Sequence, residues 1–327
     1  MQIIIPMAGY GKRLRPHTFS RPKPLINVAG EPMLKFILDT LAQIKIDEYI
    51  FIVGHLGEQI EDYVRQTTDI NAHFVTQDEM KGQSHAVYLA RDYINGPSMI
   101  LFADTLFETD LSVIEKTDAD GIAFIKEVED PRRFGVVERD ATGRVTRFIE
   151  KPTSLDNKQV VIGFYYIRDT AAMLKAIEKQ MANQQMTKGE YFLTDTFQLM
   201  VNDGAVFHTE AVDTWLDCGK PETVLETNRY LLEHGRDTSA AVTQKNVVVI
   251  PPVYVHPSAT LEDVVIGPHA TISADCTIRH SIIRDSVIDM GTEVCDSMLT
   301  GSLVGRAARV SGRWQTLNIG DESITEG

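Results

Sequence analysis

Hydrophobic and polar residues follow two different periods in the N-terminal two thirds of the chain. Short apolar runs, typical of strands buried on both faces, alternate with segments in which apolar residues recur every three or four positions, as in helices. We expect strands at 2–7, 49–53, 72–76 and 98–104, and helices at 32–45, at 57–65 and opening at 81–87. This alternation predicts an α/β domain with a Rossmann-like, mostly parallel sheet covered on both faces.

Strand-like segments then follow one another without long helices between them. We expect strands at 121–127, 134–138, 145–150 and 160–167, separated by turn signals such as Glu129-Asp130-Pro131. These segments predict a mixed sheet over the ligand crevice that forms at the carboxyl ends of parallel strands. Two apolar-striped helices are expected at 170–183 and 189–202, and a last one, entered through Pro221, ends near residue 235.

A third pattern begins at Val249. Aliphatic residues recur in steps of five or six, with Gly, Ser, Asp and Thr between them: Val249, Val255, Leu261, Ile266, Ile272, Ile278, Ile283, Ile288, Val294, Leu299 and Val304. This is the hexapeptide pattern of a left-handed parallel β-helix with three to four coils, and eleven in-phase positions disfavour an ordinary β-sandwich. We therefore predict a first domain at 1–235, a polar linker at 236–246, and a short β-helix with a tail at 247–327.

Charge and cysteine content narrow the function. The 327 residues carry a formal charge of −14, from 32 basic and 46 acidic side chains, which disfavours a general nucleic-acid or anionic-membrane binder. The sequence shows neither a signal-peptide pattern nor an apolar run of membrane-spanning length. Cys218, Cys276 and Cys295 are too scattered for a disulfide framework or a zinc site. We expect a cytoplasmic protein with reduced thiols.

The first predicted strand leads directly into a glycine-containing basic segment. Met7-Ala8-Gly9-Tyr10-Gly11 is followed by Arg13 and Lys23. Glycines allow backbone N–H groups to approach an anion, and Arg and Lys neutralise it. The segment is neither a Walker A motif nor a complete dinucleotide fingerprint, and Gly-x-Gly alone is equally typical of a tight turn. Arg13 and Lys23 shift the interpretation toward phosphate binding.

Carboxylates stand at the ends of two other strand-like segments. Asp104 ends the apolar run that begins at residue 98, and Asp217 ends Trp215-Leu216-Asp217 before a glycine turn. An Asp at the carboxyl end of a buried strand is a natural Mg²⁺ ligand, and its alternative is a helix N-cap. Glu150-Lys151 also follows a strand, where the alternative is an ordinary surface pair.

Together these motifs resemble the sugar-1-phosphate nucleotidylyltransferases, also called NDP-sugar pyrophosphorylases. The resemblance rests on Gly-x-Gly-x-Arg-Leu-x-Pro-x-Thr, on Pro-Lys-Pro-Leu, and on Gly30-Glu31-Pro32-Met33, and it covers most of the chain. Met7-Ala8-Gly9 and Lys12 depart from the usual form, which has an extra Gly and often a Thr. The family implies catalytic roles for Arg13 and Lys23, nucleotide binding by Ala8, Gly9, Gly11, Gln77, Gly82 and Asp104, sugar-phosphate binding by Gly135, Glu150, Lys151 and Gly163, and Mg²⁺ on Asp104 and Asp217.

The implied reaction is the attack of a sugar-1-phosphate oxygen on the α-phosphorus of a nucleoside triphosphate, with release of pyrophosphate. Catalysis then depends on positioning and charge neutralisation. Gln77 with Gly82 resembles the base-reading segment of thymidylyl- and uridylyltransferases, so we expect dTTP or UTP with glucose-1-phosphate. His85, a turn into the next helix, is more typical of a packing or orienting residue than of a general base.

Several alternatives stay open at this point. The chain could be a guanylyltransferase that uses GTP and mannose-1-phosphate, or a non-catalytic sugar-nucleotide-sensing subunit of the same fold. The β-helix could also be an acyltransferase domain, although three to four coils are few for that activity. We favour a role in homo-oligomerisation, through the β-helix or the catalytic domain.

Overall fold

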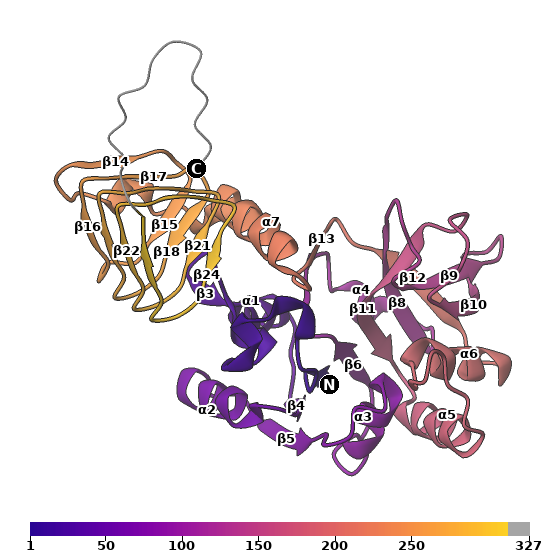
Figure 1. Cartoon of the computed structure of the whole chain (residues 1–327). Coiled ribbons are helices and arrows are strands. Elements are labelled where there is room, and N and C mark those ends of the chain that lie inside the picture. The colour runs from indigo at the N-terminus through magenta and orange to yellow at the C-terminus, as the bar shows by residue number, and fades with distance from the viewer. Residues whose placement is uncertain (313–327) are drawn as a thin grey trace. The chain divides into compact units, whose positions relative to one another are not determined.

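The structure, a computed structural model, describes residues 1–312. These residues form two compact units, one of Met1–Ile26 with Glu31–Thr223 and one of Asn27–Gly30 with the residues from Val224 on (Figure 1). The division predicted at residues 235 and 246 stays a prediction, and the part of segment 247–327 beyond residue 312 lies outside the described residues. Within 1–312, no helix combines the length and apolar character needed to cross a membrane.

A nine-stranded mixed sheet forms the centre of the first unit. The strand order is β10-β9-β11-β6-β1-β4-β5, with β8 paired to β11 and β12 paired to β8. Strands β5, β4, β1 and β6 run parallel, whereas β11 is antiparallel to β6, β8 and β9. This confirms the predicted α/β fold class. The strands are β1 Gln2–Pro6, β4 Glu48–Val53, β5 Ala72–Thr76, β6 Ser98–Leu101, β8 Gly121–Glu127, β9 Gly135–Arg139, β10 Val145–Glu150, β11 Gln159–Ile167 and β12 Phe207–Ala211.

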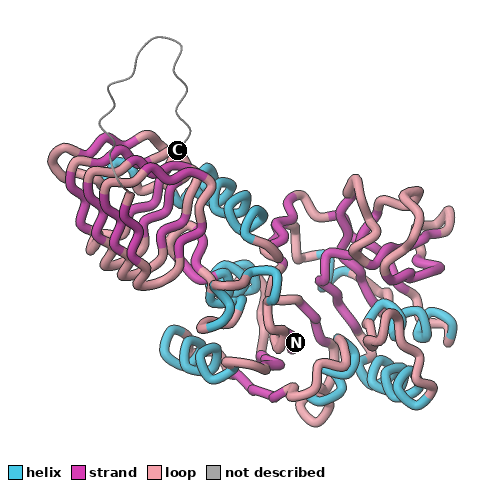
Figure 2. The backbone as a smooth tube through the Cα atoms, viewed as in Figure 1, coloured by secondary structure: helices cyan, strands magenta, loops and turns pink. Residues whose placement is uncertain are grey.

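Helices and short strands make up the elements outside the nine-stranded sheet and the β-helix (Figure 2). The helices are α1 Met33–Leu41, α2 Gly57–Thr67, α3 Gln83–Leu89, α4 Val113–Lys116, α5 Thr170–Ala182, α6 Leu193–Asn202 and α7 Pro221–Leu231. The short strands are β7 Thr105–Glu108, which pairs with β13 Thr214–Asp217, and β2 Asn27–Val28 and β3 Glu31–Pro32. The expected start of α6 at residue 189 was wrong, because Thr187 and Glu190 instead form an isolated β-bridge.

Strand β1 lies in the interior of the sheet and leads into the predicted phosphate loop. Ile3, Ile4 and Ile5 in β1 are fully buried, so the apolar run satisfies both faces of a central parallel strand. Because β1, β4, β5 and β6 run parallel, the segments that follow them leave the sheet at the same edge. The predicted phosphate loop after Pro6 and the predicted carboxylate Asp104 lie at this edge.

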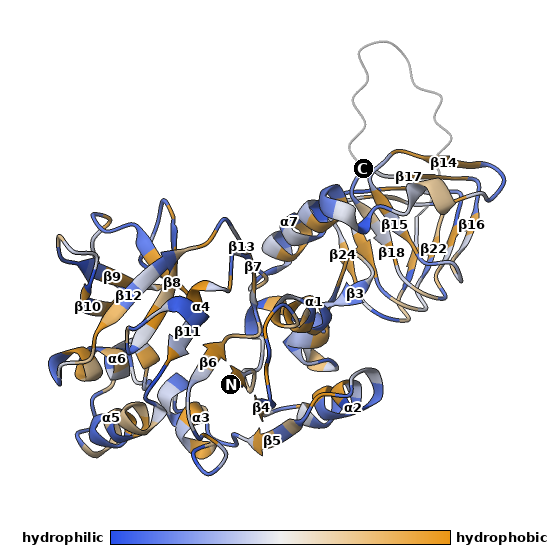
Figure 3. Ribbon diagram, turned by 180° about the vertical axis from the view of Figure 1, so that it is seen from behind, coloured by the Kyte–Doolittle hydropathy of each residue, from blue (hydrophilic) through white to orange (hydrophobic). Residues whose placement is uncertain are grey.

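The second unit contains a parallel β-helix, as predicted. Three parallel sheets of four strands each form its sides. Aliphatic residues of the repeat form a buried core cluster, and Figure 3 shows hydrophobic positions recurring along these strands. Thr260 pairs with Thr277 and Thr277 with Glu293, so successive coils advance by 17 and then 16 residues. The strands are β14 Val247–Val249, β17 Val264–Ile266, β20 Ile282–Arg284 and β23 Met298–Thr300; β15 Val253–Val255, β18 Ala270–Ile272, β21 Val287–Ile288 and β24 Leu303–Val304; and β16 Thr260–Glu262, β19 Thr277–Arg279, β22 Glu293–Cys295 and β25 Arg309–Ser311.

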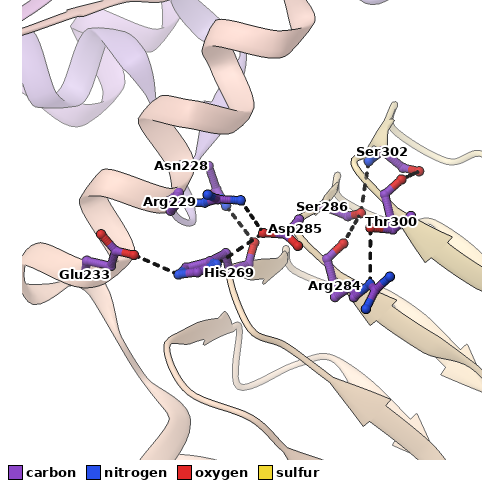
Figure 4. A network of polar contacts seen from close by, with 9 residues as sticks. All are labelled: Asn228, Arg229, Glu233, His269, Arg284, Asp285, Ser286, Thr300 and Ser302. Atoms are coloured by element: carbon purple, nitrogen blue, oxygen red, sulfur yellow. Dashed lines mark hydrogen bonds and ion pairs between the residues drawn. The ribbon is translucent and has the colours of Figure 1, made fainter.

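One side of the β-helix is joined to α7 by polar contacts (Figure 4). The buried Asn228 side chain donates to the carbonyl of His269 at 3.1 Å and accepts from the Thr271 hydroxyl at 2.7 Å. His269 contacts Glu233 at 2.9 Å, and Arg229 contacts Asp285 at 2.7 Å. Since an unpaired buried amide is costly, Asn228 fixes the position of this part of α7 on the coils.

Candidate active site

Two neighbouring cavities in the first unit contain all the predicted site residues. One, of about 470 Å³, is lined by Ala8, Gly9, Gly11, Arg13, Lys23, Gln77, Gly82 and Asp104. The other, of about 590 Å³, is lined by Arg13, Asp104, Gly135, Glu150, Lys151, Gly163 and Asp217. Arg13, Gln83, Phe102 and Asp104 belong to both. The structure therefore brings the predicted residues together in two adjoining groups that meet at Arg13 and Asp104.

The loop after β1 forms one wall of the smaller cavity. Gly11 has φ +59°, in the left-handed region, and its carbonyl accepts a 2.9 Å hydrogen bond from the Thr18 hydroxyl. A methyl group built on Gly9 would meet nothing within 4 Å. The loop backbone is thus held from one side and open on the other, as an anion-binding loop requires.

Two carboxylates and two cations surround the junction of the cavities. Lys23 Nζ lies 2.6 Å from Asp104 Oδ2. The backbone pairs Asp217 with Thr105, and Cys218 N–H donates to the Asp104 carbonyl at 3.0 Å, so Asp104 and Asp217 are brought side by side. These contacts join the loops after β1, β6 and β13.

The carboxylates at this junction have opposite pKa shifts. Burial opposes ionisation of Asp104, but the charge and hydrogen bond of Lys23, with help from Arg13, hold its pKa below the usual value. Burial raises the pKa of Asp217, and the negative charge of Asp104 raises it further against the attraction of Lys23 and Arg13. Each carboxylate therefore affects the ionisation of the other.

Gln77 lines the smaller cavity. Its side chain is buried, and its amide N–H donates to the carbonyl of Gly82 at 3.3 Å and lies 3.2 Å from His85 Nδ1. His85 thus orients Gln77, consistent with the role expected from its position. Gly82 has φ +109°, and a Cβ there would lie 2.5 Å from the backbone N and O of Tyr191. This glycine is therefore required for two chain segments to cross beside the cavity.

Glu150 and Lys151 lie in the wall of the larger cavity and do not form an exposed pair. The Glu150 side chain is 7% exposed and accepts from the Thr194 hydroxyl at 2.8 Å. Burial raises the pKa of Glu150 against the opposing effects of Thr194 and Lys151. Lys151 Nζ lies 3.8 Å from Glu150 Oε1 and 3.9 Å from the centre of the Phe192 ring. The structure thus favours a role of Glu150 and Lys151 in the cavity wall over the alternative of an ordinary surface pair.

Gly135 and Gly163 make room inside this cavity for protein atoms. Gly163 has φ +83°, at the point where β11 shifts register, and a Cβ there would lie 2.5 Å from Phe102 Cδ2. A Cβ on Gly135 would lie 2.6 Å from Thr194 Cγ2 and 3.0 Å from Glu150 Oε2. Both glycines are needed to place Phe102 and Glu150, whether or not a ligand also approaches them.

The sequence did not single out several residues that line the cavities. These include Arg132, Arg133, Lys188 and Trp215 in the larger cavity and Tyr10, Lys12 and Glu190 in the smaller one. Gly219 lines the smaller cavity, and a Cβ on it would lie 2.8 Å from both Arg13 Nη2 and Asp217 Oδ1. Its place directly after Asp217-Cys218 was the available signal, but the proximity of Arg13 depends on the fold.

The residues at the junction fit a divalent cation. Asp104 and Asp217 line one cavity and destabilise each other's charge, and carboxylate oxygens are the ligands that Mg²⁺ prefers. One oxygen of Asp104 is bonded to Lys23, which leaves the other for a metal. The donor set therefore suits Mg²⁺ with its remaining positions filled by water or phosphate oxygens.

Comparison with known proteins identifies similar chains. Residues 2–234 match the family described as nucleotidyl transferase. The chain is 32% identical over 249 residues to the bifunctional protein GlmU of Methanocaldococcus jannaschii, covering 76% of this chain but 59% of that protein. It is 30% identical to the UTP–glucose-1-phosphate uridylyltransferase AglF of Haloferax volcanii, covering 71% of this chain and 97% of that one.

Solved structures share the fold of the first unit. A UDP-glucose pyrophosphorylase complexed with UDP-glucose matches with a TM-score of 0.62 at 21% identity, over 71% of this chain and 98% of that one. A putative glucose-1-phosphate thymidylyltransferase from Bacillus anthracis matches with a TM-score of 0.61 at 23% identity, over 70% and 94%. At 21–23% identity, these matches show that the fold is shared.

The Lys23–Asp104 ion pair predicts a pH-dependent loss of stability in Lys23→Met. A lowered carboxyl pKa contributes stability above the unfolded-state value, about 4, and this contribution disappears as the pH falls through the folded-state pKa. Without Lys23, the pKa of Asp104 should rise, because this carboxylate, whose side chain is 36% exposed, loses its paired charge. Since solvent screens it in part, we expect a loss of about 1 kcal/mol at pH 7, which shrinks as the pH approaches 4.

Urea unfolding in the presence of a chelator, at pH 7 and near pH 4, would measure this loss. The double variant Lys23→Met/Asp104→Asn is the matched control, because a neutral amide should restore most of the stability at pH 7. An equal loss at both pH values would show that Lys23 acts through packing and not through its charge.

Proposed function

The chain belongs to the nucleotidyl transferase family, and on this basis we propose that it transfers a nucleotidyl group from dTTP or UTP to glucose-1-phosphate. The observation that carries the proposal is the pair of adjoining cavities that share Arg13 and Asp104. Two substrates whose phosphates must react need two pockets that meet at a charged junction. The name of the uridylyltransferase relative supports the choice of glucose-1-phosphate.

The smaller cavity is proposed to hold the triphosphate. Ala8, Gly9 and Gly11 would offer the loop backbone to the phosphates, and Gln77 and Gly82, which line the same cavity, would contact the base. The larger cavity is proposed to hold the sugar phosphate. The buried Glu150 carboxylate would accept hydrogen bonds from sugar hydroxyls, and Lys151 would hold the phosphate.

In the proposed reaction, an oxygen of the sugar phosphate attacks the α-phosphorus of the triphosphate. A new P–O bond forms, the bond between the α-phosphorus and the bridging oxygen breaks, and pyrophosphate leaves with the electron pair. Lys23 would hold the α-phosphate and the sugar phosphate together, and Arg13 would stabilise charge on the leaving pyrophosphate. No side chain needs to form a covalent intermediate.

Asp104 and Asp217 are proposed to hold Mg²⁺, which when bound would offset the repulsion between the phosphates of the two substrates. Lys23 keeps Asp104 ionised and therefore ready to bind a cation. Gly219 leaves space beside Asp217 into which a side chain would otherwise project.

Two alternative functions have weaker support. A sugar-nucleotide sensor of the same fold would not need Arg13, Lys23 and both carboxylates gathered at one junction. A second, acyl-transferring activity in the β-helix has the name "bifunctional" of the GlmU relatives in its favour. However, the chain spans 59% of the first of those relatives, and we do not extend that name to it.

Pyrophosphate release, measured over a panel of triphosphates and sugar phosphates, tests the proposal directly. We expect turnover with a pyrimidine triphosphate and glucose-1-phosphate, and a loss of at least 100-fold in Asp217→Asn, because that variant removes one of two metal-binding charges. Lys220→Ala, three positions further on and outside both cavities, is the matched control and should retain wild-type turnover. Substantial turnover in Asp217→Asn at saturating Mg²⁺ would contradict the metal assignment, and no turnover with any pair would support the sensor.

The proposed choice of base depends on the Gln77 amide. An amide can both donate and accept, as the O4 and N3–H edge of thymine or uracil requires, whereas a carboxylate suits the donors of guanine. Its Nε2 contacts Gly82 O and His85 Nδ1, so a donation to O4 of the base would replace one of these contacts, while the amide oxygen accepts from N3–H. A methyl group distinguishes thymine from uracil by only about 1–3 kcal/mol, so activity with both is expected.

Competition among the four triphosphates at equal concentration should therefore give mainly dTDP- and UDP-glucose. Gln77→Glu should shift the product toward a GDP-sugar, and we expect a change of at least tenfold in the ratio of guanine to pyrimidine products. Gln77→Ala is the control, since it should weaken all triphosphates without favouring guanine. A dominant GDP-sugar from the wild-type protein would instead support GTP with mannose-1-phosphate.

Oligomerisation through the β-helix is proposed from the character of its three sides. One side bears Arg279 and Arg309, paired with Glu262 and Glu293 of neighbouring coils at 3.2 Å. A second side is covered by Asn27–Gly30 and α7. The third side presents an outward column of aligned apolar residues, Val248, Val265, Ile282 and Met298. Val248 is 56% and Met298 69% exposed.

A second copy of the chain is the partner that this apolar column suits, because an isologous contact places the same patch on both sides. Light scattering after gel filtration should show a mass above that of one chain, and Val248→Glu/Met298→Glu should reduce it. Thr260→Glu, on the charged side, should leave the mass unchanged. A wild-type mass of a single chain, or an unchanged mass in the double variant, would exclude this interface.

A further inference from the structure

One corner of the β-helix carries a column of residues in the left-handed backbone conformation. Asp263, His280 and Asp296 have φ values of 53°, 45° and 50°. Each directly follows the last residue of a strand in the sheet β16-β19-β22, and the register of that sheet stacks them one above another. Asp and His are among the non-glycine residues that adopt this conformation most readily, so the corner itself selects such side chains.

The side chains at this corner converge with that of Cys295. One ligand atom each from His280, Cys295 and Asp296 lies within 4.8 Å of the others. His280 Nδ1 is 3.3 Å from Asp296 Oδ1, and Cys295 Sγ is 3.2 Å from Asp296 Oδ2. Ligands bound to zinc at 2.0–2.3 Å in a tetrahedron lie about 3.3–3.7 Å apart. His280 and Cys295 each lie near this separation from Asp296, though from different carboxylate oxygens, and the three ligand atoms lie within 4.8 Å of one another, so small side-chain rotations would bring them to one ion.

A fourth residue lies where an orienting partner is needed. His280 Nε2 lies 3.7 Å from Asp263 Oδ2, on the opposite edge of the ring from Asp296. Metal-bound histidines usually donate their second ring N–H to a carboxylate, which fixes the orientation of the ring. At 3.7 Å Asp263 is too far from the ring to hydrogen-bond it, but a shift of a few tenths of an ångström would make it a positioning residue, with His280 Nδ1 directed toward the metal.

We propose that His280, Cys295 and Asp296 form a binding site for a zinc-like transition metal, with Asp263 orienting the histidine. The mixture of thiol and imidazole favours Zn²⁺ or Co²⁺ over Mg²⁺ or Ca²⁺, which prefer oxygen ligands. This separates the corner site in ligand chemistry from the Asp104–Asp217 pair, which offers oxygen only.

The surroundings of the corner are compatible with a cation. Arg279, the basic residue next to His280, is paired with Glu262 at 3.2 Å. His280 is 50% and Asp296 39% exposed, so an ion can reach the site from solvent, and water can occupy a fourth position. Because His280 and Asp296 belong to successive coils, a bound metal would join them and should stabilise the β-helix against unfolding.

Cobalt binding to the tag-free, full-length protein tests this site. A thiolate bound to Co²⁺ gives an intense charge-transfer absorption, which ligation by oxygen alone does not produce. We expect this absorption to saturate at one Co²⁺ per chain at micromolar concentration and to disappear when one equivalent of Zn²⁺ is added. Cys295→Ser should abolish it, and His280→Gln should weaken binding at least tenfold. Zn²⁺ should raise the thermal unfolding temperature of the wild-type protein but not that of Cys295→Ser.

Controls at the other thiols and at another histidine locate the signal. Cys218→Ala is the necessary control because Cys218 adjoins Asp217, and Cys276→Ala tests the remaining thiol; the absorption should persist in both. His256→Gln changes a histidine of the same β-helix outside this corner and should bind normally. Absence of the charge-transfer band in folded wild-type protein, its persistence in Cys295→Ser, its loss in Cys218→Ala, or saturation only at millimolar metal would each overturn the proposal.

Discussion

The 2.6 Å ion pair between Lys23 and Asp104 is the contact around which the first unit's site is arranged. It joins the loops that follow β1 and β6, two parallel neighbours whose carboxyl ends open at one edge of the sheet. With Arg13 and Asp217 the junction contains two positive and two negative charges. The positive charges keep Asp104 ionised but do not exceed the negative ones, so a triphosphate and a sugar phosphate need further compensation. Asp104 and Asp217 could supply it by recruiting a divalent cation.

Space at this junction is created by glycines whose first partners are other protein atoms. Gly82 allows two chain segments to cross at Tyr191, and Gly163 allows β11 to pass Phe102. Phe102 lines both cavities, so the bend at Gly163 shapes the wall that they share. Family resemblance gave these glycines a role in the approach of substrate. The structure adds a physical reason for the same residues, since a side chain at either position would move the cavity wall itself.

Regular local patterns allowed most of the fold to be predicted from sequence. The central strands β1 and β4 are buried, mainly apolar runs, and the β-helix repeats its aliphatic residue every five or six positions, which sums to coils of 17 and 16 residues. Strands β7 and β12 were not predicted, because they are short and only partly apolar, whereas β13 was expected only as the strand-like segment that ends at Asp217. The predicted site residues are brought together, but Arg133, Lys188 and Gly219 were missed. Their positions depend on long-range pairing, which no local pattern encodes.

In the β-helix, the left-handed backbone conformation of the corners limits which residue types stand there, and several of these types can bind a metal ion. Each coil turns its corners with residues in the left-handed conformation, for which Asn, Asp, His and Gly are best suited. Parallel pairing repeats each corner about every 4.8 Å along the stack. The residues that suit the left-handed conformation are mostly polar, so their side chains form columns along the corners. At one such corner His269 contacts Asp285, and these two side chains also contact Glu233 and Arg229. At another corner Asp263, His280 and Asp296 stack beside Cys295. The preference for residues that adopt the left-handed conformation thus places an imidazole and carboxylates next to a thiol, which together form the proposed metal site.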